Sequence, residues 1–172
     1  MTMSAAPAAG TPESTSSRRA GFTLIELVIT VAIIGILSMT ALPLAEVTLQ
    51  RAKEHELRTA LRQIREAIDA YKQAVDEGRI PKRANVSAYP PSLDILVTGV
   101  ADARDPKQAK IYFLRRIPPD PMAIDGRLAP AQTWGVRAYK SPPDDPKAGD
   151  DVFDVYSLST AVGLNGNRYR DW

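Results

Sequence analysis

The stretch FTLIELVITVAIIGILSMTAL, residues Phe22 to Leu42, decides the fold of this chain. It is apolar apart from a single acid, Glu26, and two arginines, Arg18 and Arg19, precede it. Its 21 residues would form a helix of about 31 Å, which matches a bilayer core of roughly 30 Å. An acid inside such a helix costs a few kcal/mol and usually has a function. The stretch therefore predicts a membrane-spanning helix with a functional Glu26.

The flanks of this stretch leave three interpretations open. A secretory signal peptide is the first, although its apolar run is normally about 7–15 residues long, and the ALPLA site here has proline at the −3 position. The second is a plain membrane anchor, and the third is a leader that is cut before the apolar run. Because basic flanks stay in the cytoplasm, we expect the N-terminus there and the rest of the chain outside.

A helical pattern continues beyond the apolar stretch. Apolar residues spaced by four and three form one stripe, which predicts a helix packed on its own domain. The stripe consists of Leu57, Leu61, Ile64, Ile68, Tyr71 and Val75. The opposite face carries Arg58, Arg62, Arg65, Glu66, Asp69 and Lys72. We therefore expect one helix over 22–77 that ends at Gly78, with weak points at Gly35 and Pro43.

The C-terminal half has a different character. Eleven of the fourteen prolines lie between Pro81 and Pro146, so this half is rich in turns. Ser92 is the expected N-cap of a short helix that reaches Val97. Aromatic and β-branched residues predict three strands, over Lys110–Arg116, Thr133–Lys140 and Val152–Leu158. The expected fold class is α+β, a long N-terminal helix packed on a small antiparallel sheet.

Composition excludes several classes of function. The chain has no cysteine, so disulfides and thiol chemistry are absent, and its net charge of +2 gives no reason to expect a nucleic acid partner. The only histidine, His55, lies between two glutamates and is expected to be solvated, while Trp134 and Trp172 are expected to pack. We find no catalytic triad, phosphate loop or paired metal ligands. The sequence predicts that the protein is not an enzyme and has no resident cofactor.

The junction before the apolar stretch carries a specific motif. Gly21-Phe22-Thr23-Leu24-Ile25-Glu26-Leu27, after a basic leader, resembles the prepilin-type signal of the type IV pilin-like superfamily. The resemblance implies a type IV pilin-like fold, cleavage after Gly21 by a prepilin peptidase, and N-methylation of the new terminus at Phe22. Glycine suits the cut because the peptidase can approach its backbone closely.

The C-terminal half narrows the resemblance. Its motifs are similar, in kind and order, to those of the major pseudopilins of type II secretion. They are Tyr89-Pro90, Leu93, Tyr112–Pro121, Trp134-Gly135, Phe153–Ser157 and a final Trp172. The resemblance implies a structural subunit that polymerises in the periplasm to drive export of folded proteins across the outer membrane. The implied partners are the minor pseudopilins, the inner-membrane secretion platform and further copies of the chain.

This resemblance implies a division of the chain and its location. Residues 1–21 would be the leader, of which 1–17 are expected to be disordered, and 22–50 the transmembrane and filament-core helix. Residues 51–78 would be the amphipathic half of that helix, and 79–172 the periplasmic globular domain. The protein would sit in the bacterial inner membrane before it assembles into the pseudopilus. A type IV pilin, a minor pseudopilin and a monomeric membrane-anchored binding module remain alternatives.

Cleavage gives the acid of the apolar stretch a purpose. A buried ion costs several kcal/mol unless it is paired. Glu26 cannot easily reach the amine of its own Phe22 while the helix stays straight, but it can reach the Phe22 amine of an adjacent subunit. The pair would fix the register between subunits, and apolar burial would supply most of the cohesion. The residues expected to bury are Leu24, Leu27, Val28, Ile33, Ile34 and Leu37.

One segment departs from the family pattern. Many major pseudopilins bind calcium in a loop after the Tyr-Ser motif, but here LSTAVGLNGNRYRDW has no acid before Asp171. Five aspartates cluster upstream instead, at Asp144, Asp145, Asp150, Asp151 and Asp154. Calcium needs six to eight converging oxygens, and this spacing matches no known loop template. We expect a solvated acidic turn and no metal, with calcium as the alternative.

Overall fold

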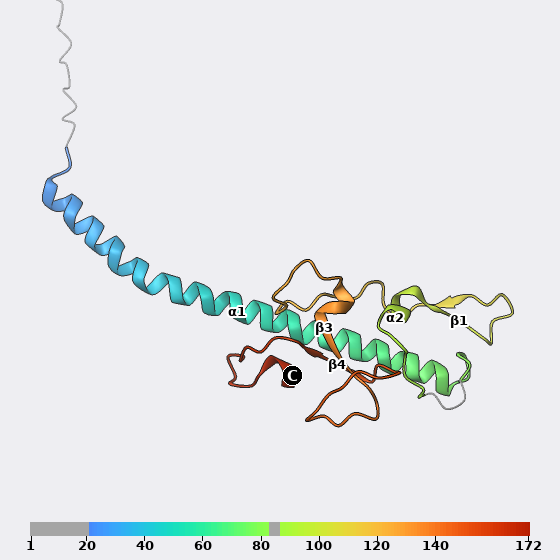
Figure 1. Ribbon diagram of the computed structural model, residues 1–172. Helices are drawn as coiled ribbons and strands as arrows, with labels where there is room; N and C mark the ends of the chain where they lie inside the picture. Colours follow the sequence, from blue (N-terminus) through green and yellow to red (C-terminus); the bar gives the residue numbers. More distant parts are fainter. Residues whose placement is uncertain (1–20, 83–86) are drawn as a thin grey trace, which may run out of the picture. The chain divides into compact units, whose positions relative to one another are not determined.

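The computed structural model describes residues 21–82 and 87–172, and within the first helix the side chains of residues 40–44 are not described. Residues 1–17, which we expected to be disordered, and the leader arginines Arg18 and Arg19 therefore lie outside the described residues. Helix α1, Leu24–Asp76, has 53 residues and is the dominant element (Figure 1). The chain divides into two units at Pro43, and each is described by itself below.

Helix α1 matches the helix predicted over 22–77 to within two residues at each end. It runs through Gly35 and Pro43, and a bend at these positions stays a prediction. At its C-terminus Gly78 has φ 71°, and the Arg79 and Gly78 amides donate to the carbonyls of Ala74 and Val75, both at 2.9 Å. These two bonds form a Schellman cap, which glycine permits because it has no Cβ. The predicted stop at Gly78 is confirmed.

The apolar stripe of α1 is the centre of the core. All six stripe residues are buried, and Ala60, Ala67 and Ala74 bury on the same face. The alanines let the C-terminal half approach the helix closely, while the larger residues interdigitate with it. The residues packed against the helix are Ile80, Leu93, Leu96, Leu114, Ile117, Trp134, Val152, Val155 and Tyr169. The predicted packing of the second half of the helix on its own domain is confirmed.

Two small antiparallel sheets replace the single sheet expected. β1, Val100–Ala101, pairs with β2, Lys110–Ile111, and β3, Trp134–Arg137, pairs with β4, Asp154–Ser157. The α+β class is confirmed.

The strand lengths were wrong, because neighbouring elements take the backbone groups that longer strands would need. β2 ends early since the Phe113 and Leu114 amides donate to the Leu96 carbonyl. β3 starts late since residues 130–133 form a 3-10 turn, η1, Pro130–Thr133.

The short helix after the proline pair also differs from its prediction. α2, Asp94–Thr98, has Leu93 at its N-cap and no side-chain cap, so the prediction that Ser92 caps it was wrong. Leu93 and Leu96 are both buried in the core, and their packing fixes where the helix starts. Gly99, with φ 75°, ends it, and a Cβ there would lie 2.9 Å from the Tyr112 ring. Tertiary packing has overridden the local capping preference.

Two charged side chains of α1, one buried and one partly buried, attach the C-terminal segment to the helix. Glu54 accepts hydrogen bonds from the Leu164 amide at 2.7 Å and from the Tyr169 hydroxyl at 3.0 Å. Arg65 pairs with Asp154 at 2.8 Å and donates to the Trp172 carbonyl oxygen at 2.8 Å. Both helix residues reach segments about 90 to 115 positions away. The C-terminus is therefore fixed to the helix by charge-assisted hydrogen bonds.

Candidate assembly and processing site

The predicted cleavage junction lies immediately before α1 and outside it. Gly21, Phe22 and Thr23 have no regular structure and are exposed, and nothing lies within 4 Å of a Cβ placed on Gly21. Thr23 is the cap of the helix: its carbonyl accepts from the Leu27 amide at 3.1 Å, and its hydroxyl accepts from the Glu26 amide at 3.3 Å. A side-chain oxygen here satisfies one of the helix-end donors that have no intrahelical partner.

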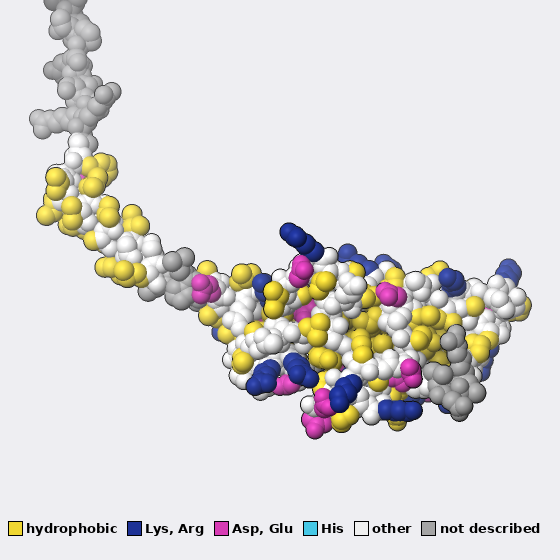
Figure 2. All heavy atoms as spheres, in the orientation of Figure 1, with side chains coloured by type: hydrophobic (Ala, Val, Ile, Leu, Met, Phe, Trp, Pro, Cys, Tyr) yellow, Lys and Arg dark blue, Asp and Glu magenta, His cyan; other side chains and the backbone are white. Residues whose placement is uncertain are grey.

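Apolar side chains cover the N-terminal half of α1 on every face. Every large hydrophobic residue from Leu24 to Met39 is between 52% and 82% exposed. They are Leu24, Ile25, Leu27, Val28, Ile29, Val31, Ile33, Ile34, Ile36, Leu37 and Met39. Figure 2 shows apolar side chains on both edges of this part of the helix. A helix that is apolar all round is found buried in a large core or in lipid, so this one needs cover from outside its own chain.

The hydroxyl groups in this half already have partners. Thr30 donates to the Leu27 carbonyl at 2.9 Å, and Ser38 donates to the Ile34 carbonyl at 2.8 Å. Such bonds to the preceding turn let a hydroxyl sit on an apolar surface without an unsatisfied donor. Neither residue therefore opposes burial of the segment.

Glu26 is the exception in this segment. It lies in the first turn of α1, where the positive end of the helix dipole favours an acid. Its side chain is exposed, and within residues 21–82 and 87–172 its carboxylate has neither a hydrogen-bond donor nor an ion-pair partner. The structure thus brings Gly21, Phe22 and Glu26 within one short stretch at the start of α1. No described residue occupies the carboxylate of Glu26.

The membrane span predicted for the apolar half can be compared with the helices of the structure. Among the described residues, no helix is both long enough and apolar enough to cross a membrane. The span predicted over Phe22–Leu42 includes three positions whose side chains are not described, and it stays a prediction.

The acidic turn of the C-terminal half does not gather its carboxylates. Among the described residues, no group of three or more His, Cys, Asp or Glu side chains could hold a metal ion. Asp154 pairs with Arg65 and Arg137, Asp151 accepts from the Tyr139 amide at 2.8 Å, and Asp145 pairs with Lys147. These carboxylates have structural partners. That the protein has no cofactor stays a prediction.

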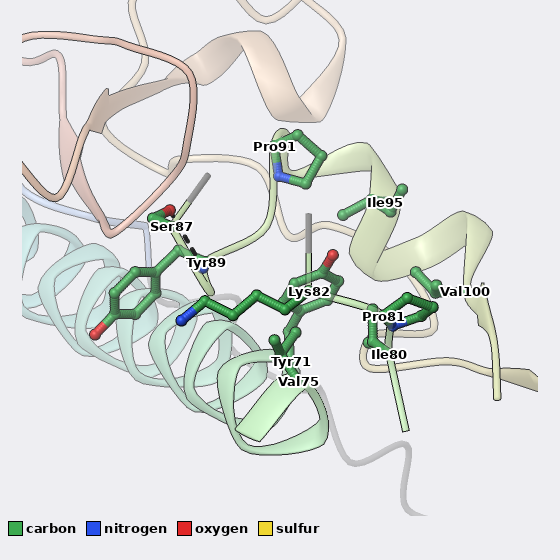
Figure 3. A pocket seen from close by; sticks show the side chains of 10 residues that line it. All are labelled: Tyr71, Val75, Ile80, Pro81, Lys82, Ser87, Tyr89, Pro91, Ile95 and Val100. Atoms are coloured by element: carbon green, nitrogen blue, oxygen red, sulfur yellow. Dashed lines mark hydrogen bonds between the residues drawn. The ribbon is translucent and has the colours of Figure 1, made fainter. Parts of the chain in front are cut away.

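A cavity of about 220 Å³ lies at the far end of α1 (Figure 3). Tyr71 and Val75 of the helix form one wall, and Ile95 of α2 forms another. Burial raises the pKa of Tyr89, so this phenol stays neutral at physiological pH. Among the described residues that line the cavity are one lysine, Lys82, and two tyrosines, and none of these lining residues carries a carboxylate. The cavity lacks the acid and base pair that most hydrolytic or transfer chemistry uses.

Comparison with known proteins finds similarity at the same N-terminal stretch and to proteins of type II secretion. A family model described as the prokaryotic N-terminal methylation motif matches residues 16–42. Type II secretion system core protein G of Klebsiella pneumoniae is 29% identical over 141 residues, which cover 78% of this chain and 93% of that protein. The protein of the same name from Aeromonas hydrophila is 26% identical, over 82% of this chain and 94% of its own length. The chain resembles a type II secretion major pseudopilin.

These comparisons confirm the resemblance that the sequence motifs indicated. No solved structure matches the chain significantly. The similar proteins are named as components of type II secretion, which supports a pseudopilin role for this chain, and the absence of enzymatic activity stays a prediction. A pseudopilin of this kind is expected to be anchored in a membrane through its N-terminal helix.

Sequence reasoning missed the polar residues that hold the C-terminal loop. Glu54 lies three positions before Leu57, so it continues the apolar stripe towards the N-terminus and lies on the buried face. This spacing was the signal that could have predicted a buried acid. Arg65 was placed on the solvated face, but it is half-buried against Asp154 and the C-terminal Trp172. No local pattern reveals a partner 107 residues away.

Proposed function

We propose that this protein is the major pseudopilin of a type II secretion system, a structural subunit that polymerises through the N-terminal half of α1. The resulting filament would stand in the periplasm and drive export of folded proteins across the outer membrane. The observation that carries the proposal is a helix half that is apolar on every face and exposed, and whose one acid has no partner among residues 21–82 and 87–172.

Burial of the apolar half supplies the driving force for assembly. Each large aliphatic side chain gains about 1.5–3 kcal/mol when it moves from water to an apolar environment. In a bilayer this gain is already made, so assembly out of lipid must replace lipid contacts with contacts between helices of neighbouring subunits. Close packing of α1 halves would provide them. Ile33, Ile34 and Leu37, whose side chains are more than half exposed, would lie at these contacts.

Glu26 supplies the specificity of assembly. Prepilin peptidase would cut between Gly21 and Phe22 and methylate the new Phe22 amine, which keeps its positive charge. The carboxylate of Glu26 in one subunit would then pair with the Phe22 amine of the next. A carboxylate buried alone is strongly destabilising, whereas a hydrogen-bonded ion pair recovers most of that cost. Uncut precursor lacks the amine, so processing would precede assembly.

Location and partners follow from this scheme. Before assembly the subunit would cross the inner membrane once through residues 22–42, with its N-terminus in the cytoplasm and residues 79–172 in the periplasm. The inner-membrane secretion platform would add subunits to the filament, and minor pseudopilins would associate with it. Calcium is not required by the scheme, because protein partners already engage Asp151 and Asp154.

The proposal is tested by following processing and assembly separately in Glu26→Val. We expect a mature chain that starts at methylated Phe22, seen by mass spectrometry, but no filament in membranes that overproduce the variant. Thr30→Val is the matched control, since it also removes a polar group from the segment but one whose hydroxyl is satisfied inside the helix. Normal filaments from Glu26→Val, or a mature chain that does not start at Phe22, would contradict the proposal.

A further inference from the structure

At the start of α1, the Glu26 amide could donate to either of two acceptors, the Phe22 carbonyl or the Thr23 hydroxyl. In a helix that extended further towards the N-terminus, the Glu26 amide would donate to the Phe22 carbonyl, and the Ile25 amide to the Gly21 carbonyl. In the structure the Thr23 hydroxyl takes the Glu26 amide at 3.3 Å instead. The first backbone bond of the helix is then that of Leu27 to the Thr23 carbonyl, at 3.1 Å. The hydroxyl of Thr23 therefore stops the helix at Leu24.

This stop has a chemical consequence for the bond before Phe22. Proteolysis adds water to the carbonyl carbon of the scissile peptide, breaks its C–N bond, and transfers a proton to the departing amine. A peptide inside a helix has its carbonyl engaged and its backbone enclosed by neighbouring turns. Here Gly21 and Phe22 lie outside the helix, are exposed, and have open space on the Gly21 side.

We propose that Thr23 is a positioning residue for processing, which keeps the Gly21–Phe22 peptide out of α1 and open to the peptidase. The inference rests on the proposed cleavage after Gly21. It assigns to the second residue of the mature chain a role that is separate from that of Glu26. Glu26 acts after the cut, between subunits, whereas the Thr23 hydroxyl acts before the cut, within one chain.

The size of the effect follows from the strength of an N-cap. Replacement of threonine by a residue without a side-chain oxygen shifts the balance between capped and uncapped helix ends by roughly five-fold. Thr23→Val keeps the shape of the side chain and removes the acceptor, so we expect cleavage to slow by about that factor. Thr23→Ser restores an oxygen at the same place and should be cut within about two-fold of the wild-type rate.

The experiment uses the full-length precursor in proteoliposomes with purified prepilin peptidase at substrate concentrations below KM. Initial cleavage rates are measured by mass spectrometry of the released leader for wild type, Thr23→Val, Thr23→Ser and the control Thr30→Val. In parallel, carbon chemical shifts of Gly21 and Phe22 are recorded for each labelled precursor in detergent micelles. We expect slow cleavage and helical shifts at these two residues in Thr23→Val alone.

The outcomes separate this inference from the proposed function. Equal cleavage of wild type and Thr23→Val, with cutting after Gly21 in both, would overturn the inference and leave the proposed function intact. A wild-type precursor that is not cut after Gly21 would overturn both. Slow cleavage of Thr23→Val without helical shifts at Gly21 and Phe22 would also overturn it, because the threonine would then act through direct contact with the peptidase.

Discussion

The two halves of α1 differ in how their apolar side chains are covered. Between Leu57 and Val75 the helix carries one apolar stripe, and its own chain covers that stripe completely. Between Leu24 and Met39 the helix is apolar on every face, and its large apolar side chains are all more than half exposed. A single continuous helix therefore has one half that packs on its own domain and one half for which we propose a partner from another subunit. The difference is set by the pattern of apolar residues and not by their number.

The acids of the two halves repeat this contrast. Glu54 is buried and accepts two hydrogen bonds from the C-terminal loop. Glu26 is exposed and has no partner among the described residues. A carboxylate on an apolar face is tolerated only when donors surround it once it is buried. The donors for Glu54, in the second half of α1, come from its own chain. For Glu26, in the N-terminal half, we propose that the donor is the Phe22 amine of another subunit.

Matched truncations should separate the two halves most clearly. Ile64 is fully buried, so Ile64→Ala removes a packed side chain and should lower the free energy of unfolding by about 2–5 kcal/mol. Ile34 is 61% exposed, so Ile34→Ala should change it by less than about 0.5 kcal/mol. Urea unfolding of the full chain in mild detergent, followed by fluorescence of the buried Trp134, measures both. Equal losses would mean that the two halves are covered alike.

The acids provide the second contrast. Glu54→Leu leaves the Leu164 amide and the Tyr169 hydroxyl without their acceptor, and we expect a loss of about 2–3 kcal/mol in the same unfolding assay. Glu26→Leu should leave the stability of the globular unit unchanged while it blocks assembly. If Glu54→Leu unfolds at the wild-type urea concentration, the two hydrogen bonds of Glu54 do not stabilise the loop.

A smaller effect is expected from pH. Burial raises the pKa of Tyr169, and its hydroxyl donates to Glu54. Because the pKa in the folded state lies above the unfolded value of about 10, the stabilisation is present below pH 10 and is lost as pH rises through the raised pKa. Urea midpoints measured between pH 8 and pH 11 should fall faster for the wild type than for Tyr169→Phe. Parallel curves would contradict this assignment.

The helix was predictable from sequence for a physical reason. The periodic stripe from Leu57 to Val75 and the glycine at 78 are local signals, and local signals determine where a helix packs and ends. The apolar stretch and the motif around Gly21 are local too, and cleavage after Gly21 stays a prediction from that motif.

The sheets and the polar contacts were not predictable in the same way. β2 ends at Ile111 because the Phe113 and Leu114 amides donate to the Leu96 carbonyl, which lies in a different element. Arg65 finds Asp154 and the chain terminus only after the chain has folded back on the helix. Strand lengths and long-range ion pairs depend on which backbone groups meet in three dimensions, and a single sequence carries no local signal for this.

The central claim is that the apolar half of α1 is covered by further copies of the chain, and crosslinking tests it most directly. The chain has no cysteine, so one introduced cysteine reports a single position. We would compare Ile33→Cys in the apolar half with Ala70→Cys on the exposed face of the second half, after oxidation in membranes. The account predicts rapid disulfide-linked dimers for Ile33→Cys and markedly fewer for Ala70→Cys. Monomers alone from Ile33→Cys, with mature Phe22 termini, would contradict it.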